Sequence, residues 1–278
     1  MSNPPIRKPR FQAFPIRISF GFRSSIFELP AGVFLALLLA TAACRTSDTP
    51  AVAAGNDLPI YRCPRIDREL AVTGKLDDPF WDRAPVVRLV EAASGAAPRQ
   101  PTEVRILRGP ARLYIGFRCA DTHVWGTKTA RDADIFNEEC VEVFISPAGT
   151  AHQYYEINVS PKNVVFDACV LNRRIRPGMR APYQGIPAFD VKGLETAIHI
   201  DGELDRPGGA TAWSAEYAIP FDSIIGAPNV PPQAGYRWRL NLYRIDAPEG
   251  AKREFSAWSP TRVIDFHLPE AFGTLEFE

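Results

Sequence analysis

Apolar and polar residues alternate strictly along many short stretches of this chain. In "RLYIGFRCA", the apolar residues Leu113, Ile115, Phe117 and Cys119 occupy every second position. Successive side chains of a β-strand point to opposite faces, so this period of two predicts a strand with one buried face. The pattern therefore excludes a long amphipathic helix here and favours a sheet.

The same period continues further along the chain. In "VEVFIS", Val141, Val143 and Ile145 share one face, and Glu142 and Phe144 share the other. Further stretches alternate in the same way, namely "YYEINVS", "NVVFDACV", "ETAIHID", "AWSAEYAIP", "YRWRLNLYRID" and "TLEF". About ten strands with one polar and one apolar face predict two antiparallel sheets packed face to face.

Proline and glycine punctuate the gaps between these stretches. The chain has 26 prolines, which argues against long helices and for loops between short strands. Residues 220–226, "PFDSIIG", could form one helical turn. We predict an all-β fold, a single antiparallel β-sandwich of jelly-roll-like form. Its longest irregular stretch, residues 171–190, is a candidate binding loop because long loops on rigid scaffolds commonly carry function.

The first 44 residues predict an export signal. A basic segment precedes residues 29–44, "LPAGVFLALLLATAAC", which carry no charge. This run is shorter than the roughly 20 apolar residues that span a bilayer. "TAAC" makes Cys44 a candidate lipidated N-terminus, with plain cleavage nearby or uncleaved anchoring as alternatives. We expect a periplasmic or cell-surface protein.

The rest of the chain divides into a linker and one domain. Residues 45–60 are small, polar and proline-containing, as expected of a flexible linker. Residues 61–278 are long enough to form one β-rich domain with a sizeable core.

The overall charge of the chain does not indicate a class of binding partner. Lysine plus arginine equals aspartate plus glutamate at 32 each, so no global field attracts the chain to nucleic acid or a membrane. The basic run "NRRIRPGMR" at residues 172–180 remains a local candidate site. We therefore expect no nucleic-acid partner, and membrane contact only through a lipid anchor.

Four cysteines follow the signal: Cys63, Cys119, Cys140 and Cys169. An exported protein meets an oxidising compartment, so one or two disulfides are allowed and the pairing stays open. For Cys119, which lies mid-strand, a buried free thiol is as good an interpretation as a bridge. The spacing suggests neither a zinc ribbon nor covalent haem.

The acidic stretch "DADIFNEECVEVFISPAG" offers candidate chemistry. Glu138 and Glu139 precede a strand, and we expect them to be solvated. Glu142 is different because its strand position sends it to a defined face beside Phe144. No nucleophile elbow, phosphate loop or zinc helix occurs, and the histidines show no ligand spacing. The sequence thus contains no positive catalytic motif.

The tryptophans divide into core and site candidates. Trp81 is expected to plug the core, and Trp213 and Trp238 fall on apolar strand faces. Trp258 lies at a strand end just before a proline, where an aromatic ring could stack on the flat face of a sugar. Trp125, in a loop before the acidic stretch, stays open.

Several stretches occur in the order found in one known family. They are "VTGKLDDPFWDRAP", "TEVRILRGPARLYIGFRCAD", "DIFNEECVEVFISP", "WSAEYAIPF", "YRWRLNLYRID" and "AWSPT…FHLPEAFGTLEF". This ordered set resembles the family nine carbohydrate-binding modules over nearly all of residues 60–278. The resemblance implies a β-sandwich, frequent attachment to xylanases and other polysaccharide-degrading enzymes, and structural calcium with ligands that the sequence does not identify.

The resemblance also implies site residues. Sugar-binding members sandwich a terminal sugar between two aromatic rings while polar residues hold its hydroxyls. Trp258 matches one ring, and Phe136 matches the other, where sugar binders have tryptophan. Glu142 matches the hydroxyl-binding carboxylate.

Other positions depart from the pattern. Glu156 stands where a sugar binder has arginine, and Tyr243 stands where it has glutamine. These changes keep the fold and bear on the sugar specificity. Asn241, Arg239 and Tyr243 share one strand face as a candidate polar wall. The implied carbohydrate-binding set is Phe136, Glu142, Trp258, Tyr243, Asn241 and Glu156.

The leading interpretation is an exported, non-catalytic protein that binds sugars or polysaccharide ends through an aromatic clamp. It would support polysaccharide catabolism, with a glycoside hydrolase as a candidate partner. One alternative is a glycoside hydrolase using Glu142 and Glu156, since such enzymes place two carboxylates roughly 5–10 Å apart. Another is a DOMON-like redox domain with non-covalent haem, although Met179 is the only methionine beyond the start.

Overall fold

The computed structural model describes residues 58–150, 152–172, 183–248 and 250–278. These residues belong to a compact unit that runs from Pro50 to Glu278. The predicted export signal with Cys44 and most of the predicted linker lie outside the described residues, as does Met179. Among the described residues, no helix has the length and apolar character needed to cross a membrane.

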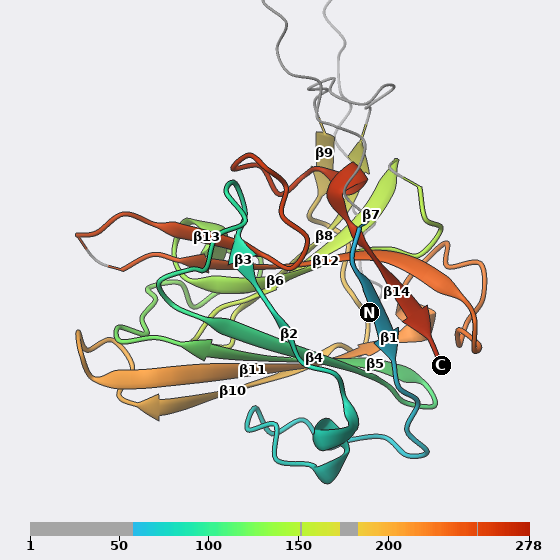
Figure 1. Ribbon diagram of the computed structural model, residues 1–278, viewed down its shortest axis with the longest axis horizontal. Helices are drawn as coiled ribbons and strands as arrows, with labels where there is room; N and C mark the ends of the chain where they lie inside the picture. Colours follow the sequence, from blue (N-terminus) through green and yellow to red (C-terminus); the bar gives the residue numbers. More distant parts are fainter. Residues whose placement is uncertain (1–57, 151, 173–182, 249) are drawn as a thin grey trace, which may run out of the picture. The chain divides into compact units, whose positions relative to one another are not determined.

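The described strands form two sheets of nine and five strands that face each other (Figure 1). The larger sheet has the path β1 (Ile60–Cys63), β14 (Gly273–Phe277), β12 (Arg237–Asp246), β6 (Cys140–Ser146), β7 (Gln153–Val159), β8 (Val165–Asn172) and β9 (Tyr183–Ile186). Off this path, β13 (Glu254–Ala257) pairs with β12 and with β3 (Val90–Glu91). The smaller sheet runs β10 (Glu195–Gly202), β11 (Ala210–Pro220), β5 (Arg112–Ala120), β4 (Thr102–Arg108) and β2 (Val87–Arg88). The predicted all-β sandwich is confirmed.

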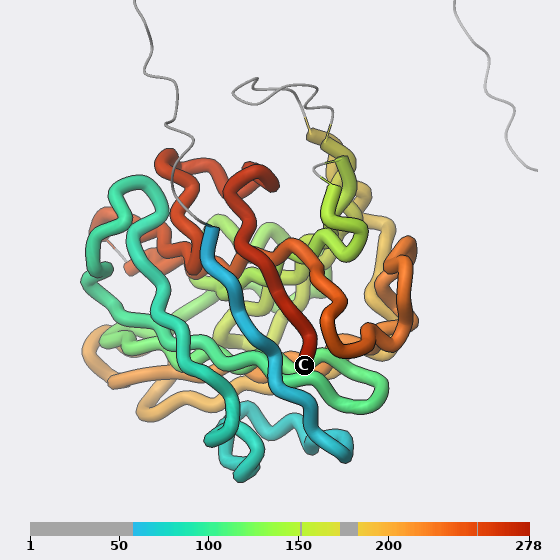
Figure 2. Tube along the Cα trace, turned by 45° about the vertical axis from the view of Figure 1, so that its right-hand side comes forward, coloured from blue at the N-terminus to red at the C-terminus, as the bar shows by residue number. Residues whose placement is uncertain are grey.

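Strand pairing is antiparallel except at one edge. There β1 runs parallel to β14, with Ile60 opposite Thr274 and Cys63 opposite Phe277. Figure 2 shows this blue strand beside the red one. The first and last described strands therefore close the same edge of the larger sheet.

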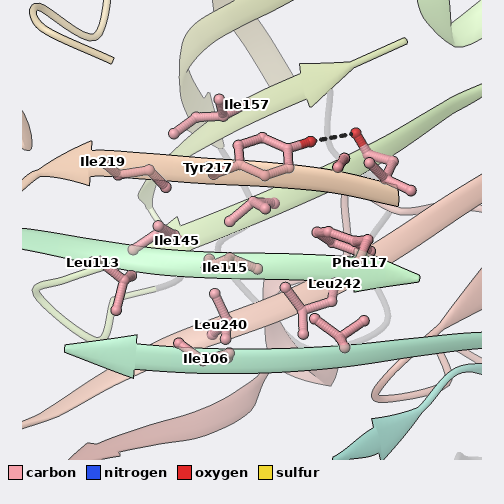
Figure 3. Packing of buried hydrophobic residues seen from close by; sticks show 14 of the residues in the cluster. Ile106, Leu113, Ile115, Phe117, Ile145, Ile157, Tyr217, Ile219, Leu240 and Leu242 are labelled. Atoms are coloured by element: carbon pink, nitrogen blue, oxygen red, sulfur yellow. Dashed lines mark hydrogen bonds between the residues drawn. The ribbon is translucent and has the colours of Figure 1, made fainter. Parts of the chain in front are cut away.

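The core lies between the two sheets (Figure 3). Its residues include Leu113, Ile115 and Phe117 from β5 and Ile145 from β6, all with no exposed surface. They are the apolar faces that the period of two identifies. The Tyr217 hydroxyl in this core donates a 2.9 Å hydrogen bond to a backbone carbonyl of β6.

The predicted tryptophan plugs and the helical turn are confirmed. Trp213 and Trp238 are buried in the central core. Trp81 is buried in a separate cluster, and its Nε1 donates a 2.9 Å hydrogen bond to buried Glu216. A short 3₁₀ helix spans Phe221–Ser223.

Further 3₁₀ helices span Pro79–Arg83, Ile135–Asn137 and Pro269–Ala271. The four described cysteines are free thiols, fully buried at Cys63, Cys119 and Cys140 and half-buried at Cys169. Burial as a small apolar side chain is thus the role of Cys119.

The larger sheet is also covered on its outer face, which points away from the smaller sheet. Every residue of β6 is buried, although only alternate residues reach the central core. Phe144 on the outer face packs with Tyr154, Tyr243 and Phe272. The covering segment includes residues 264–267, which follow β13, so this face is a second packed layer and carries the candidate site.

Candidate functional site

A pocket of about 540 Å³ opens on the outer face of the larger sheet. We call it the outer pocket. Its floor comes from β6, β7 and β8, and its walls come from β9, the 3₁₀ helix Ile135–Asn137, β13 and residues 264–267. Its ring-bearing side chains are Phe136, Phe166, Tyr183, Phe255, Phe266 and His267. Concave, largely apolar surfaces of this size with few polar groups are typical of small-molecule sites.

Glu142 and Glu156 lie on neighbouring strands of the pocket floor. The register pairs Glu142 with Asn158 and Phe144 with Glu156. Directly opposite residues of an antiparallel pair project to the same face, so both carboxyl groups point to the outer face. The sequence predicted the face of Glu142, and the structure brings Glu156 beside it.

Both carboxyl groups are buried, with few protein partners. Glu142 is 2% exposed and Glu156 is 7% exposed. The Cys140 thiol donates to Glu142 Oε1 over 3.4 Å, and Asn158 Nδ2 donates to Glu156 Oε1 over 2.8 Å. The strand pairing thus holds the two acids in place. Their remaining carboxyl oxygens can accept hydrogen bonds from a ligand in the pocket.

Burial controls the protonation of these groups. It raises the pKa of Glu142 well above its usual range, and the neighbouring charge of Glu156 adds to this effect. Burial also raises the pKa of Glu156 to about 7. His267 Nε2 lies 4.0 Å from Glu156 Oε2, and burial lowers the pKa of this imidazole to about 4. At neutral pH the pair therefore retains proton, and His267 is neutral.

One wall of the outer pocket consists of phenylalanine side chains and the side chain of Arg253. Phe136 meets Phe166 edge to face, with ring centroids 5.3 Å apart. The Arg253 guanidinium lies 5.0 Å over the Phe255 ring, and its Nη2 donates to the Phe136 carbonyl. Arg253 is thus held by the wall that it lines.

The opposite wall of the outer pocket is formed by His267 and the side chains that contact it. The Tyr183 ring stacks on this imidazole, with centroids 3.7 Å apart and planes inclined by 18°. The Tyr154 hydroxyl and His267 Nδ1 share a 2.8 Å hydrogen bond. Because Tyr183 is 48% exposed, its outer ring surface is free to contact a ligand.

Asn241 and Tyr243 stand behind the pocket and do not line it. Both are fully buried. Asn241 Nδ2 donates to the Tyr243 hydroxyl over 2.8 Å and to the Ser259 carbonyl over 2.9 Å. The Tyr243 ring stacks on Phe266, with centroids 4.0 Å apart, and its hydroxyl donates to the Phe266 carbonyl. These two residues position the lining ring of Phe266.

Trp258 does not lie in the outer pocket, which corrects the predicted clamp. It belongs to the central core, where it is 8% exposed and meets Tyr61 edge to face at 6.5 Å. A Cβ atom added at Gly273 would approach its ring to 2.6 Å. The residue directly follows β13 with its side chain turned inward, so it does not face Phe136 across the outer pocket.

Glu138 and Glu139 are also buried, so the prediction of two solvated acids is wrong. Glu138 accepts hydrogen bonds from the Thr127 amide at 2.8 Å and from the Thr127 hydroxyl. Glu139 accepts a 3.2 Å hydrogen bond from the Trp125 amide. The loop of residues 125–128 packs over these acids, and sequence alone gives no sign of that contact.

Glu139 belongs to a buried acidic group with Asp121 and Asp246. One carboxylate oxygen from each lies within 4.8 Å of the others. Arg244 donates to Asp121 Oδ2 over 2.7 Å, yet Glu139 Oε1 and Asp246 Oδ1 are buried without a hydrogen-bond partner. Burial raises the pKa of Glu139 to about 9. Oxygen donors with unpartnered lone pairs fit a hard cation such as calcium.

Sequence reasoning missed most of the wall residues: Phe166, Tyr183, Arg253, Phe255, Phe266 and His267. Tyr183 lies in the irregular stretch 171–190, which was marked as a candidate binding loop, so a signal for it existed. No spacing in the sequence identifies the other residues as parts of one site, because their positions depend on how segments distant in sequence fold over the sheet.

Glu156→Gln should change the pH dependence of stability. The folded pKa of about 7 exceeds the ordinary value of about 4.3. Between these values the folded state holds a proton that the unfolded state has lost, so this contribution to stability falls as pH rises. We expect the variant to gain on the order of 2–3 kcal/mol over the wild type between pH 4.5 and pH 8.

Urea unfolding of both proteins at the two pH values measures this gain. His267 is present in both proteins, whereas the pKa of Glu142 falls when the charge of Glu156 is removed, which adds a gain in the same direction. An unchanged difference between variant and wild type at the two pH values would contradict the buried position of Glu156.

An antiparallel sandwich with an aromatic pocket and a few convergent polar groups defines a class of ligand-binding modules. The chain belongs to Carbohydrate-binding family 9, whose model matches residues 91–277. It is also 24% identical over 200 residues to an extracellular protein of Arthroderma benhamiae, covering 69% of this chain and 85% of that protein.

Solved structures share the fold. A candidate carbohydrate-binding protein from Bacteroides uniformis matches with a TM-score of 0.61 and 18% identity, over 80% of this chain and all of that one. A family 9 module from Caldicellulosiruptor kristjanssonii in complex with cellotriose matches with a TM-score of 0.55 and 12% identity, over 79% of this chain and 94% of that one. The same kind of module in complex with glucose matches with a TM-score of 0.51 and 13% identity, over 77% and 95%.

Proposed function

We propose that this protein binds carbohydrate in the outer pocket and does not itself catalyse a reaction. The observation that carries the proposal is the convergence of two buried carboxyl groups, Glu142 and Glu156, on an aromatic-lined pocket of about 540 Å³. Membership of Carbohydrate-binding family 9 supports it.

The chemistry of the pocket suits a sugar. A sugar ring offers flat C–H surfaces and an equatorial rim of hydroxyl groups. The rings of Phe136 and Tyr183 provide apolar surface for the former, and the two glutamates accept or donate hydrogen bonds to the latter. Neither role requires a nucleophile, so binding alone accounts for the arrangement.

The wider setting is part of the same proposal. Export, with Cys44 as a candidate lipid anchor, is supported by the extracellular relative and by the apolar segment before that cysteine. Ligands such as cellotriose and glucose in similar modules point to sugars or polysaccharide ends as ligands. A polysaccharide-degrading enzyme is the expected partner, because a non-catalytic binder acts by holding substrate near an active site.

Glu142→Leu should weaken binding by about 1–3 kcal/mol, roughly 5- to 150-fold in Kd, because ligand hydroxyls lose their buried partner. Phe136→Ala should weaken it through lost ring contact. The measurement is a glycan panel on the wild type, followed by titration of the best glycan with each variant. Glu203→Leu, at an exposed acid directly after β10, is the matched control and should bind normally.

Two results would contradict this proposal. One is the absence of binding to any glycan in the panel, and the other is equal affinity in the wild type and both pocket variants. Release of reducing sugar by the wild type, lost in Glu142→Leu and in Glu156→Gln, would instead favour the hydrolase alternative.

We further propose a structural calcium ion at Asp121, Glu139 and Asp246, because Glu139 Oε1 and Asp246 Oδ1 are buried without a hydrogen bond, and Arg244 Nη2 approaches only the second of them, at 3.6 Å. A divalent cation would neutralise charge that Arg244 alone leaves in excess. Calcium in the millimolar range should therefore raise the melting temperature by several degrees, as expected for a ligand that binds only the folded state. Differential scanning calorimetry with chelator and with calcium measures this effect.

Glu139→Gln is the control for the calcium proposal. The variant removes one negative donor from the group, so its melting temperature should respond little to calcium. An equal rise in wild type and variant would place the bound ion elsewhere and contradict the assignment.

A further inference from the structure

We propose that the outer pocket prefers a carbohydrate unit carrying a protonated amine, such as a 2-amino-2-deoxy sugar, over its neutral counterpart. This inference rests on the proposed function and names the ligand class of that same site. It depends on the charged residues that line the pocket, on the carboxyl oxygens of Glu142 and Glu156 that have few hydrogen-bond donors, and on the aromatic rings around them.

The pocket is rich in acids and poor in bases. Four acids line it: Asp134, Glu142, Glu156 and Asp265. Arg253 is the sole lysine or arginine among the described lining residues. Its guanidinium lies over the Phe255 ring and its Nη2 donates to the Phe136 carbonyl, while its Nε has no hydrogen-bond partner and its charge offsets part of the rise that burial causes in the pKa of Glu142. Among the described lining residues, a cationic group would therefore meet more acids than bases.

The floor holds two buried acids without a cation between them. In the described part of the chain, Glu142 has one hydrogen bond, from the weak thiol donor of Cys140. Burying two carboxylates side by side is costly unless a positive charge or a proton is shared with them. In the ligand-free pocket the pair keeps a proton; an ammonium group would take over that proton's role.

The exchange can be written in full. Near pH 7 the ligand-free pair holds between one and two protons, because burial raises the pKa of Glu142 well above its usual range and the pKa of Glu156 to about 7. When R–NH₃⁺ binds, its N–H groups donate to both carboxylates, the carboxyl O–H bonds of the pair break, and their protons leave to solvent. Binding of a fully protonated amine therefore releases between one and two protons per site near neutral pH, and any amine that is neutral in solution takes up one proton to bind and lowers this number.

Other ionisable groups lie around Glu142 and could also release or take up protons when a ligand binds. From its own strand and the adjacent strands it faces Cys140, Glu156 and Tyr243; from the covering segments it faces Arg253, Asp265, His267 and Tyr183. The tyrosines, the buried thiol and neutral His267 hold their protonation state near pH 7, so Glu142 and Glu156 are the groups that respond.

The rings add a second reason for the preference. An ammonium group near the faces of phenylalanine or tyrosine is attracted by the ring quadrupole, more strongly when it is desolvated. Phe136, Phe166 and Tyr183 line the same pocket. A neutral hydroxyl gains neither this attraction nor an ion pair with the floor.

Calorimetric titration with three trimers of equal length tests the inference: the fully deacetylated glucosamine trimer, the N-acetylglucosamine trimer and cellotriose. At pH 7 we expect the glucosamine trimer to bind about tenfold or more tightly than cellotriose. Titrations in two buffers of different ionisation enthalpy should show proton release for the glucosamine trimer alone. The preference should persist at high salt, which screens surface attraction more than a buried contact.

Glu156→Gln should reduce the preference and the proton release, because Glu142 alone remains to pair with the amine, while Glu203→Gln, at an exposed acid directly after β10, should retain both. Cellotriose binding that equals or exceeds glucosamine-trimer binding in the wild type would overturn this inference and leave the proposed function standing. A preference unchanged in Glu156→Gln, or abolished by salt, would also overturn it. Failure of the wild type to bind any of the trimers or any glycan of the wider panel would instead contradict the proposed function.

Discussion

Trp258→Ala should lower the free energy of unfolding by about 3–5 kcal/mol, the range for removing a buried large aromatic side chain. Its indole packs against Tyr61 in the central core and lies so close to Gly273 that an added Cβ there would clash with it. The truncation leaves a cavity between well-ordered strands, so little relaxation is expected. Urea unfolding monitored by circular dichroism measures the change.

Tyr236→Ala is a suitable comparison, because Tyr236 is an aromatic residue with 38% of its surface exposed. It should lose much less stability than Trp258→Ala. A Trp258→Ala protein that is as stable as the wild type but no longer binds glycan would restore Trp258 as a clamp residue and contradict its core position.

Arg244→Met should lower the free energy of unfolding by about 3–5 kcal/mol in calcium-free buffer, the range for leaving a buried charge without its partner. Arg244 is 1% exposed. It extends from β12 in the larger sheet and donates to Asp121 Oδ2 at 2.7 Å and to the Ala120 carbonyl at 2.8 Å, at the end of β5 in the smaller sheet. The substitution breaks a link between the sheets and leaves the acidic group unneutralised.

Arg237→Met, on the same strand, provides the matched control. Arg237 is exposed and pairs with Glu276 at 2.6 Å, and surface pairs contribute about 0–1 kcal/mol. If urea unfolding showed equal losses of stability in the two variants, the buried contacts of Arg244 would stabilise the fold no more than an exposed ion pair does.

The sequence was sufficient for the sandwich because the period of two follows directly from strand geometry. Val143 and Ile145 reach the core and Glu142 faces away from it, as their alternation predicts. The same logic failed for Glu138 and Glu139. It treats the non-core side of a segment as solvent, whereas here the loop of residues 125–128 folds back and covers both residues.

The candidate site shows the same limit. Glu142, Glu156 and Phe136 were identified, and the structure gathers all three in the outer pocket. Trp258 was misplaced because a tryptophan at a strand end can turn either inward or outward, and only the packing around Gly273 decides. His267 could not be found from spacing, because its position depends on the path of the segment after β13.

The most direct test of the central claim maps where a glycan binds. Isotope-labelled protein is titrated with the best glycan from the panel while amide resonances are followed by nuclear magnetic resonance. The account predicts that the largest shift changes occur at pocket residues such as Phe166, Ala168 and Gly185, with little change on β10 and β11. Changes concentrated on the smaller sheet would contradict carbohydrate binding in the outer pocket.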